Sequence, residues 1–232
     1  MSEHQSTKAT FENPKAVVQS TYDLIAPQYL AWSAPRPTET RAAYIKRLVD
    51  LLPPSAKILE LGCGAGVPST QSIAAHESAF HITGVDISES QVQLAREHVG
   101  GGDVKGKVEF IRSDMMEFEV AEGSYDAVLA FYSVFHLPAP EQGPMMAKMV
   151  TWLKPGGFLL FNLNTKAGDS IHDDWMGGPM FSSGLGIDGN REAMGKALEG
   201  KGVKVIEDEV AIEYVGRFEE KFHWFFAQKD SM

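Results

Sequence analysis

Three glycines alternate in the run Ile58 to Gly66, which reads ILELGCGAG. The apolar start predicts a buried strand, and a helix is expected directly after the last glycine. Glycine lets the backbone turn sharply and lets a ligand approach without a clash at Cβ. The helix N-terminus offers free N–H groups, which suit a carboxylate or a phosphate. The alternative is a tight turn without a ligand, but three glycines at such a junction destabilise the chain unless something uses the space.

The spacing of these glycines separates two kinds of ligand site. A dinucleotide-binding fingerprint has the form G-x-G-x-x-G, whereas Val67 stands where its last glycine would be. The chain instead has G-x-G-x-G over Gly62, Gly64 and Gly66, and Glu60 lies two residues before the first glycine. The turn is therefore predicted to serve a ligand other than a dinucleotide.

Asp86 ends a second apolar run, Phe80 to Val85. It lies about 20 residues after the glycine turn, where nucleoside-binding α/β domains place an acid on the ribose hydroxyls. A carboxylate accepts hydrogen bonds from both hydroxyls of a diol, and such charge-assisted bonds are strong. Capping of the next helix is the alternative role, but Ser88 fills that role better.

His136 is the best candidate for a general base. It follows the apolar run 125–132, at the mouth of the expected sheet, where α/β proteins bind ligands. Histidine titrates near neutrality, which suits proton transfer. A structural histidine at the start of a loop is the alternative.

Apolar runs alternate with helical patterns along the chain, which is typical of a doubly wound α/β fold. Helices are expected at 14–26, 38–52, 67–76, 141–153 and 190–200, with another from Ser88. In the second, Tyr44, Ile45, Leu48, Leu51 and Leu52 share one face. Strands are expected at 57–61, 80–85, 108–112, 125–132, 158–163, 203–214 and 218–227.

The last two expected strands are separated only by a short turn at Gly216. That turn is too short for a helical crossover, so the two strands must pair antiparallel. Five parallel strands followed by an antiparallel hairpin differ from the plain dinucleotide-binding arrangement. The sequence thus predicts a Rossmann-like sheet of seven strands.

The glycine motif with Glu60 resembles motif I of the class I S-adenosylmethionine (SAM)-dependent methyltransferases, and the predicted seven-stranded sheet resembles theirs. The segment Tyr22 to Tyr29 is similar to the Tyr-Asp-x-x-Ala-x-x-Tyr segment of small-molecule methyltransferases of the type 11/25-like family. The resemblance extends from about Tyr22 to Lys229. It implies methyl transfer from SAM to a small-molecule acceptor, at an O, N, S or C atom.

The resemblance also implies roles for individual residues. Asp114 would bind the adenine amino group, Met115 would pack on the ring, and the backbone near Phe131 would face the methionine part of SAM. The helical region 14–52 would form a lid that shields the sulfonium; an amphipathic helix packed on the sheet is the alternative. The implied cofactor-binding residues are Tyr22, Tyr29, Glu60, Gly62, Cys63, Gly64, Gly66, Asp86, Ile87, Ser113, Asp114, Met115 and Phe131.

The segment 164–188 is expected to be an unusually long loop, and long loops tend to be functional. In the resembled family this region covers the acceptor. Its aromatic and methionine side chains suit an adaptable apolar pocket. His172, Asp173 and Asp174 are adjacent, which is poor spacing for a metal, so no metal is expected. The expected acceptor-binding residues are Trp32, His136, Asn164, Trp175, Met176, Met180 and Phe181.

Composition limits the class of protein. The chain has 232 residues and suits one domain, 14–232, after a flexible tail at 1–13. Its net charge of −10 disfavours a nucleic acid partner. Cys63 is the single cysteine, so no internal disulfide forms, and no apolar run approaches a membrane span. We expect a cytoplasmic monomer or homodimer that does not bind membranes.

Two functions remain open at this point. The first is methyl transfer to a small molecule. The second is a SAM-fold protein that binds the cofactor without methyl transfer, such as a cyclase or a regulatory binder. Methylation of a nucleic acid base is disfavoured, because the expected fourth strand continues as Ala130-Phe131-Tyr132-Ser133 and lacks the Asn/Asp-Pro-Pro-aromatic run of base amino methyltransferases.

Overall fold

The computed structural model describes residues 12–35, 38–215 and 218–231. Most of the tail expected at 1–13 therefore lies outside the described residues, as does the turn residue Gly216. Asn13 belongs to the described part and is already ordered by the first helix, since its side-chain oxygen accepts a hydrogen bond from the N–H of Ala16.

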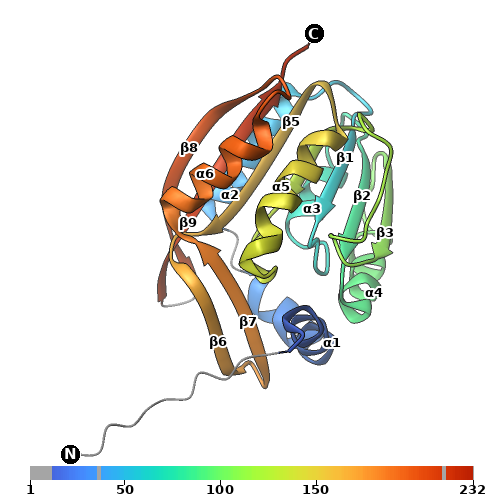
Figure 1. Ribbon diagram of the computed structural model, residues 1–232. Coiled ribbons are helices and arrows are strands. Elements are labelled where there is room, and N and C mark those ends of the chain that lie inside the picture. The colour runs from blue at the N-terminus through green and yellow to red at the C-terminus, as the bar shows by residue number, and fades with distance from the viewer. Residues whose placement is uncertain (1–11, 36–37, 216–217, 232) are drawn as a thin grey trace, which may run out of the picture.

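One seven-stranded sheet forms the centre of the molecule, in the order β3-β2-β1-β4-β5-β9-β8 (Figure 1). The strands are β1 (Lys57–Leu61), β2 (His81–Asp86), β3 (Lys107–Arg112), β4 (Tyr125–Ala130), β5 (Leu153–Asn164), β8 (Val203–Val215) and β9 (Phe218–Lys229). The first five are parallel, and β9 pairs antiparallel with both β5 and β8. The predicted five parallel strands with a C-terminal antiparallel hairpin are confirmed.

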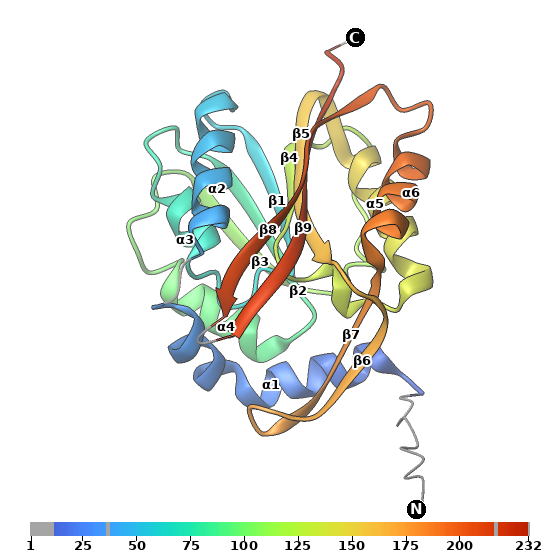
Figure 2. The ribbon, with the colours of Figure 1, turned by 90° about the vertical axis from the view of Figure 1, so that its left-hand side faces the viewer.

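Helices cover both faces of this sheet, as a doubly wound fold requires (Figure 2). The helices α2 (Glu39–Leu51), α3 (Ser69–Ala74) and α4 (Glu89–His98) lie on one face, and α5 (Ala139–Trp152) and α6 (Gly186–Leu198) on the other. Each face has its own apolar core, the first around Leu48 and Ile58 and the second around Leu59 and Trp152. Successive residues of β1 thus anchor opposite layers.

Local signals fixed several helix ends correctly. Thr38 precedes α2, and the Ser88 side chain caps α4 by accepting a hydrogen bond from the N–H of Gln91. One expected core residue was wrong: Leu51 is 49% exposed, and Val49 is buried in its place. Leu51 belongs to the last turn of α2, beyond the face that contacts the sheet.

Helix α1 (Pro14–Ser33) runs through Pro27 to Ser33, whereas the sequence analysis expected this helix to end at about Ala26. Proline removes one backbone hydrogen bond, but tertiary contacts outweigh that loss. The Thr21 hydroxyl donates to the carbonyl of Pro179, and the Asp23 carboxylate accepts a 2.6 Å hydrogen bond from the Ser88 hydroxyl. The helix runs across one end of the sheet (Figures 1 and 2).

The segment 164–188 is not a loop, which corrects the expectation. It forms a hairpin of β6 (Ala167–Trp175) and β7 (Gly178–Leu185), and α6 begins at Gly186 rather than at residue 190. The connecting residues Met176 and Gly177 both have positive φ, at 58° and 106°, a conformation found in two-residue hairpin turns. Met180 and Phe181 pack against Val18 of α1, which gives the hairpin a small core of its own.

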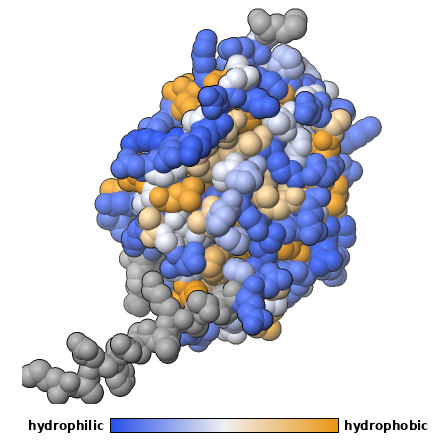
Figure 3. All heavy atoms as spheres, viewed as in Figure 1, coloured by the Kyte–Doolittle hydropathy of each residue, from blue (hydrophilic) through white to orange (hydrophobic). Residues whose placement is uncertain are grey.

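The surface is mostly polar on the face seen in Figure 1, and apolar residues there are scattered in small groups (Figure 3). Among the described residues, no helix combines the length and the apolar character that crossing a membrane requires.

Candidate active site

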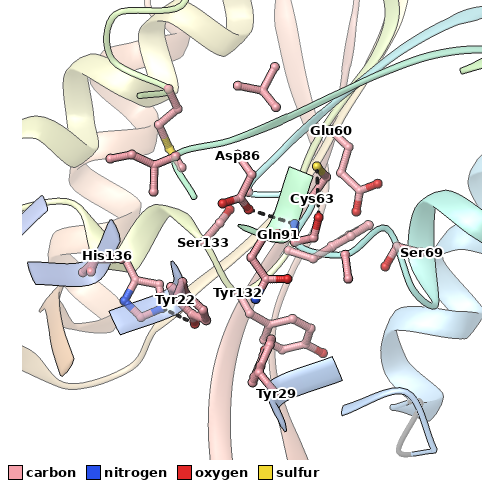
Figure 4. A pocket seen from close by; sticks show the side chains of 18 of the residues that line it. Tyr22, Tyr29, Glu60, Cys63, Ser69, Asp86, Gln91, Tyr132, Ser133 and His136 are labelled. Carbon is pink, nitrogen blue, oxygen red and sulfur yellow. Dashed lines mark hydrogen bonds between the residues drawn. The ribbon is translucent and has the colours of Figure 1, made fainter. Parts of the chain in front are cut away.

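The first cavity lies where the carboxyl ends of β1, β2 and β4 meet helix α1. It contains about 1040 Å³ of space free of protein atoms, including its open mouth. Figure 4 shows its side chains converging from the strand ends and the helix. Twelve of the thirteen residues expected to bind the cofactor line it: Tyr22, Tyr29, Glu60, Gly62, Cys63, Gly64, Asp86, Ile87, Ser113, Asp114, Met115 and Phe131.

Gly66 is the thirteenth, and it serves packing rather than the cavity. A Cβ at this position would lie 2.7 Å from Cγ2 of Val99, which no real side chain tolerates. Gly64 differs, because a Cβ there would meet only Oε1 of Gln91, 3.8 Å away, at the cavity wall. The glycine turn therefore has two physical uses, one in helix packing and one in leaving room for a ligand.

The Asp86 carboxylate holds the glycine turn in place by accepting backbone hydrogen bonds. One carboxylate oxygen accepts a 2.8 Å hydrogen bond from the N–H of Gly64, and the other accepts a 2.9 Å bond from the N–H of Ser88. The side chain is only 9% exposed, and burial raises its pKa to about 6 in spite of these bonds. A carboxylate accepts about four hydrogen bonds, so Asp86 retains acceptor capacity toward the cavity.

Glu60 is a second buried acid of the first cavity. It is 3% exposed and accepts a hydrogen bond from the Thr70 hydroxyl of α3. Burial raises its pKa to about 7, while the Thr70 bond and the charge of Arg41 lower it. Two desolvated carboxylates in one cavity favour a cationic ligand, which would hold both in the ionised form.

Gln91 is a cavity residue that the sequence reasoning missed. It is 1% exposed on the first turn of α4, and neither polar atom of its amide has a hydrogen-bond partner in the described part of the chain. A buried amide without partners is costly, so its presence at the wall points to a bound polar group. No sequence signal marked it, because glutamine is common on exposed helix turns.

Asp114 connects the first cavity to α1. One of its oxygens lies 2.7 Å from Nζ of Lys15, and the other accepts a 2.9 Å hydrogen bond from the N–H of Met116. Lys15 also lies 3.0 Å from Glu141 of α5. The first turn of α1 is therefore tied to the loop after β3, next to Met115.

His136 ends a short helix, η1 (Val134–His136), at the boundary of the first cavity (Figure 4). Its Nδ1 lies 2.7 Å from the carbonyl of Phe181, so Nδ1 carries the proton and donates it. Nε2 then accepts a 3.2 Å hydrogen bond from the Tyr22 hydroxyl. Burial lowers the His136 pKa to about 4, so the ring is neutral at pH 7 and Nε2 has a lone pair.

A second cavity of about 970 Å³, open at its mouth, adjoins the first. Six residues line both cavities, namely Tyr22, Tyr29, Ser33, Arg41, Tyr132 and His136. Four of the seven expected acceptor residues line the second cavity, namely Trp32, His136, Trp175 and Met180. Trp175 comes from the end of β6, so the hairpin provides one wall.

The other three expected acceptor residues lie outside the lining of the second cavity. The Asn164 side chain donates a 3.3 Å hydrogen bond to the carbonyl of Ser183 and so holds β5 to β7. Phe181 is 3% exposed and belongs to the small core with Val18. Met176 occupies the hairpin turn. An expected loop gave no means of telling which side chains faced inward.

Thr38, Arg41, Tyr132 and Glu213 are among the residues of the second cavity that were not singled out from the sequence. The Tyr132 hydroxyl donates a 2.6 Å hydrogen bond to Glu213 of β8, and the Thr38 hydroxyl lies 2.8 Å from the same Tyr132 oxygen. The Arg41 guanidinium carbon lies 5.3 Å from the centre of the Tyr132 ring. These residues come from distant parts of the chain and share no motif. Within the described residues, no group of three or more His, Cys, Asp or Glu could hold a metal.

The residues of the first cavity fit SAM, the cofactor that the resemblance implied. SAM offers a ribose diol, an adenine amino group, a carboxylate, an ammonium and a sulfonium. Asp86 and the unpartnered amide of Gln91 suit hydroxyl groups, and Asp114 suits an amino donor. The buried acids balance the cationic groups, and Arg41 suits the carboxylate.

Comparison with known proteins agrees with this assignment. Residues 58–157 match the family model described as a methyltransferase domain. The 27-O-demethylrifamycin SV methyltransferase of Amycolatopsis mediterranei is 34% identical over 115 residues, which are 49% of this chain and 41% of that protein. The chain spans less than half the length of the curated relatives it matches.

Solved structures share the fold. The magnesium protoporphyrin IX methyltransferase of Synechocystis PCC 6803, with bound SAM, has a TM-score of 0.68 at 16% identity, over 96% of this chain and 100% of that one. A crystal structure described as a (4+2)-cyclase has a TM-score of 0.68 at 18% identity, over 92% and 95% of the two chains. The chain therefore has the class I methyltransferase fold, and its residues 58–157, which contain the glycine turn and Asp86, are similar to a methyltransferase domain.

Proposed function

We propose that the protein transfers the methyl group of SAM to a small-molecule acceptor bound in the second cavity, at an O, N, S or C atom. One observation carries this proposal: the cavity that fits SAM and the second cavity share a wall at Tyr22, Tyr132 and His136. SAM, when bound, supplies an electrophilic methyl group on its sulfonium. The protein then has to position the acceptor, which alone lowers a barrier by roughly 7–11 kcal/mol.

The aromatic rings of Tyr22, Tyr29, Trp32 and Trp175 form a roof over the shared wall, and we propose that this roof excludes water from it. The Tyr22 ring lies 5.4 Å from that of Tyr29 and 5.7 Å from that of Trp175, and the Tyr29 and Trp32 rings are stacked at 5.8 Å. These rings come from α1 and the hairpin. A dry site strengthens the polar interactions within it and protects a reactive cofactor from hydrolysis.

His136 is the group proposed to accept a proton where the acceptor carries one. Its Nδ1–H is fixed on the Phe181 carbonyl, so Nε2 is the basic atom, and that atom faces Tyr22. Proton transfer to a positioned base contributes about 10²–10⁴-fold to a rate. An acceptor that is already deprotonated needs no such base.

A small molecule suits the site better than a nucleic acid does. The second cavity is of limited volume and has aromatic rings and Met180 in its wall, while the chain carries a net charge of −10. That charge opposes the approach of a phosphate backbone. We propose in addition that the protein is a monomer or a homodimer, which light scattering of the purified protein determines.

The second candidate function is SAM binding without methyl transfer, as in a cyclase or a regulatory binder. It is kept because one protein of the same fold is described as a cyclase. That likeness extends to the fold alone. The two candidates differ in a measurable way, because only methyl transfer converts SAM to S-adenosylhomocysteine (SAH).

The test uses purified protein, SAM labelled in its methyl group, and fractions of small metabolites from a cell extract. Methyl transfer predicts label in a low-molecular-weight product and one SAH for each product molecule. Conversion of a metabolite without SAH would support the second candidate. If calorimetry detects binding of neither SAM nor SAH, both candidates are wrong.

A further inference from the structure

The second cavity presents aromatic faces on several sides. Trp32 and Trp175 line it from α1 and β6, Phe135 from η1, and Phe222 from β9. The Phe135 and Phe222 rings are stacked, with centroids 5.9 Å apart. Such walls match the flat faces of a planar ring, which gains favourable stacking or edge contacts there.

One polar group stands out in this wall, the carboxylate of Glu213. It belongs to β8, the edge strand of the sheet, yet it is only 4% exposed. Glu209, four residues earlier on the same strand, is exposed and accepts a 2.7 Å hydrogen bond from the Tyr44 hydroxyl. An edge strand can leave an acid in water, so the burial of Glu213 carries a desolvation cost that needs a compensating use.

The carboxylate of Glu213 is fixed but not saturated. Its Oε1 accepts a 2.9 Å hydrogen bond from Nε1 of Trp224, and its Oε2 accepts the 2.6 Å bond from Tyr132. Tyr132 cannot rotate freely, because the Thr38 hydroxyl lies 2.8 Å from its oxygen. The Thr38 hydroxyl also reaches the Glu213 carboxylate. A carboxylate accepts about four hydrogen bonds, so about one remains for a ligand in the cavity.

The backbone also holds Tyr132 in an unusual conformation. Its φ of 53° is in the left-handed region, which is rare for a bulky residue. Its N–H donates a 2.7 Å hydrogen bond to Oδ1 of Asn162, a fully buried side chain of β5. Strain of this kind persists where surrounding contacts enforce it, and it is typical of functional sites.

We propose that Glu213 anchors the acceptor by accepting a hydrogen bond from a hydroxyl or amino group of a neutral, planar aromatic molecule. This inference rests on the proposed function, in which the second cavity holds the acceptor. A purely hydrocarbon acceptor would leave the remaining acceptor capacity of the buried Glu213 carboxylate unused. A cationic acceptor is disfavoured because the positive charge of Arg41, which lines the same cavity, would repel it.

The test compares three probes of one ring system, each titrated into the protein saturated with SAH. These are β-naphthol, which has a donor; its methyl ether, which has none; and naphthylmethylammonium, which is a cation. The proposal predicts that β-naphthol binds at least tenfold more tightly than either of the other two. Equal binding of naphthol and its ether, or tighter binding of the cation, would overturn it.

A pair of variants then assigns the effect to Glu213. In Glu213→Gln the preference for naphthol over the ether should fall to within about threefold, because the remaining amide oxygen is shared by Tyr132 and Trp224. The matched control Glu209→Gln, on the same strand but outside both cavities, should keep the full preference. An undiminished preference in Glu213→Gln would assign the donor contact to another residue and refute the proposal.

Folding and cofactor binding are measured in the same samples. SAH affinity in Glu213→Gln should stay within about twofold of the unmodified protein, which shows that the first cavity is intact. If that variant does not fold, Glu213→Asp keeps the charge but withdraws it by one methylene, and it should still weaken naphthol binding several-fold. If the unmodified protein does not bind SAH at all, that result would instead count against the proposed function itself.

Discussion

Eleven of the 26 residues that line the first cavity, including Glu60, Asp86 and Gln91, come from one continuous stretch that spans β1, α3, β2 and the start of α4. The second cavity gathers its residues from Tyr22 to Phe222, from α1, α2, the hairpin and the last two strands of the sheet. A local stretch fixes its own geometry, whereas the second cavity depends on the packing of distant elements. The difference suggests that one cavity serves a common cofactor and the other a particular acceptor.

The largest expected effect is at the shared wall. His136→Gln should lower turnover by about 10²–10⁴ while SAH affinity is unchanged, since glutamine cannot accept a proton. Steady-state rates and SAH calorimetry on the same preparation measure both quantities. Rates within a few-fold of the unmodified protein would assign His136 a structural role or show that the acceptor needs no base.

The pH profile of turnover sharpens the same test. Because burial lowers the His136 pKa to about 4, Nε2 remains unprotonated well below neutrality. The rate should therefore stay level down to about pH 5 and fall only below it, not near the 6.5 of an ordinary histidine. A fall centred near pH 6.5 would show either that the ring is solvated during turnover or that another group titrates.

A change confined to the first cavity should alter cofactor binding alone. Asp86→Ala should weaken SAH binding at least tenfold, since each charge-assisted bond to a ribose hydroxyl contributes about 1.5–3 kcal/mol. The control is Glu89→Ala, which removes an exposed acid from the first turn of α4; this variant should bind SAH normally. An unchanged affinity in Asp86→Ala would remove Asp86 from the binding site, and a melted protein would show that its bonds to Gly64 and Ser88 are mainly structural.

The acids of the first cavity predict a pH-dependent affinity for SAM. Burial raises the pKa of Asp86 to about 6 and that of Glu60 to about 7, and a cationic ligand favours their ionised forms. Affinity should thus be nearly full above pH 7.5 and fall as the pH drops through these values, by roughly a hundredfold at pH 5.5. Calorimetry between pH 5.5 and 8 measures this, and Glu60→Gln should flatten the upper part of the curve. A level profile in the unmodified protein would contradict the electrostatic match.

The smallest effect concerns the wall of the second cavity. Trp175→Leu should raise the KM for the acceptor about 2- to 12-fold, the value of one aromatic contact of 0.5–1.5 kcal/mol, with SAH affinity unchanged. Asp173→Ala, an exposed position on the same strand, is the matched control. A Trp175 variant that loses SAH binding but keeps its KM would break the division between the two cavities.

The sequence was sufficient where structure follows from short-range rules. The glycine turn, Asp86 and the Ser88 cap could be predicted because strand ends and helix starts carry recognisable residues at fixed spacing. The antiparallel end of the sheet followed from the short connection between its last two strands. The predicted end of α1 was wrong because the contacts of this helix with β7 and α4 outweigh the backbone hydrogen bond lost at Pro27.

The second cavity was only half predictable, for a physical reason. Trp32 and Trp175 could be named because large aromatic side chains are conspicuous near an expected site. Glu213 and Tyr132 could not, since their pairing requires that β8 return beside β9 and that Tyr132 adopt a left-handed backbone. The sequence predicts a loop where the hairpin lies, and a loop has no regular alternation that would tell which way Phe181 and Met176 point.

The position of α1 has a thermodynamic consequence. The helix is fastened by Lys15 to Asp114, by Asp23 to Ser88 and by Thr21 to Pro179, while its Tyr22 lines both cavities. A ligand that favours the docked helix from one cavity lowers the cost of ordering the same helix for the other. By linkage, the factor by which SAM tightens the acceptor must equal the factor by which the acceptor tightens SAM. We therefore expect SAM and the acceptor to bind cooperatively, each tightening the binding of the other through α1.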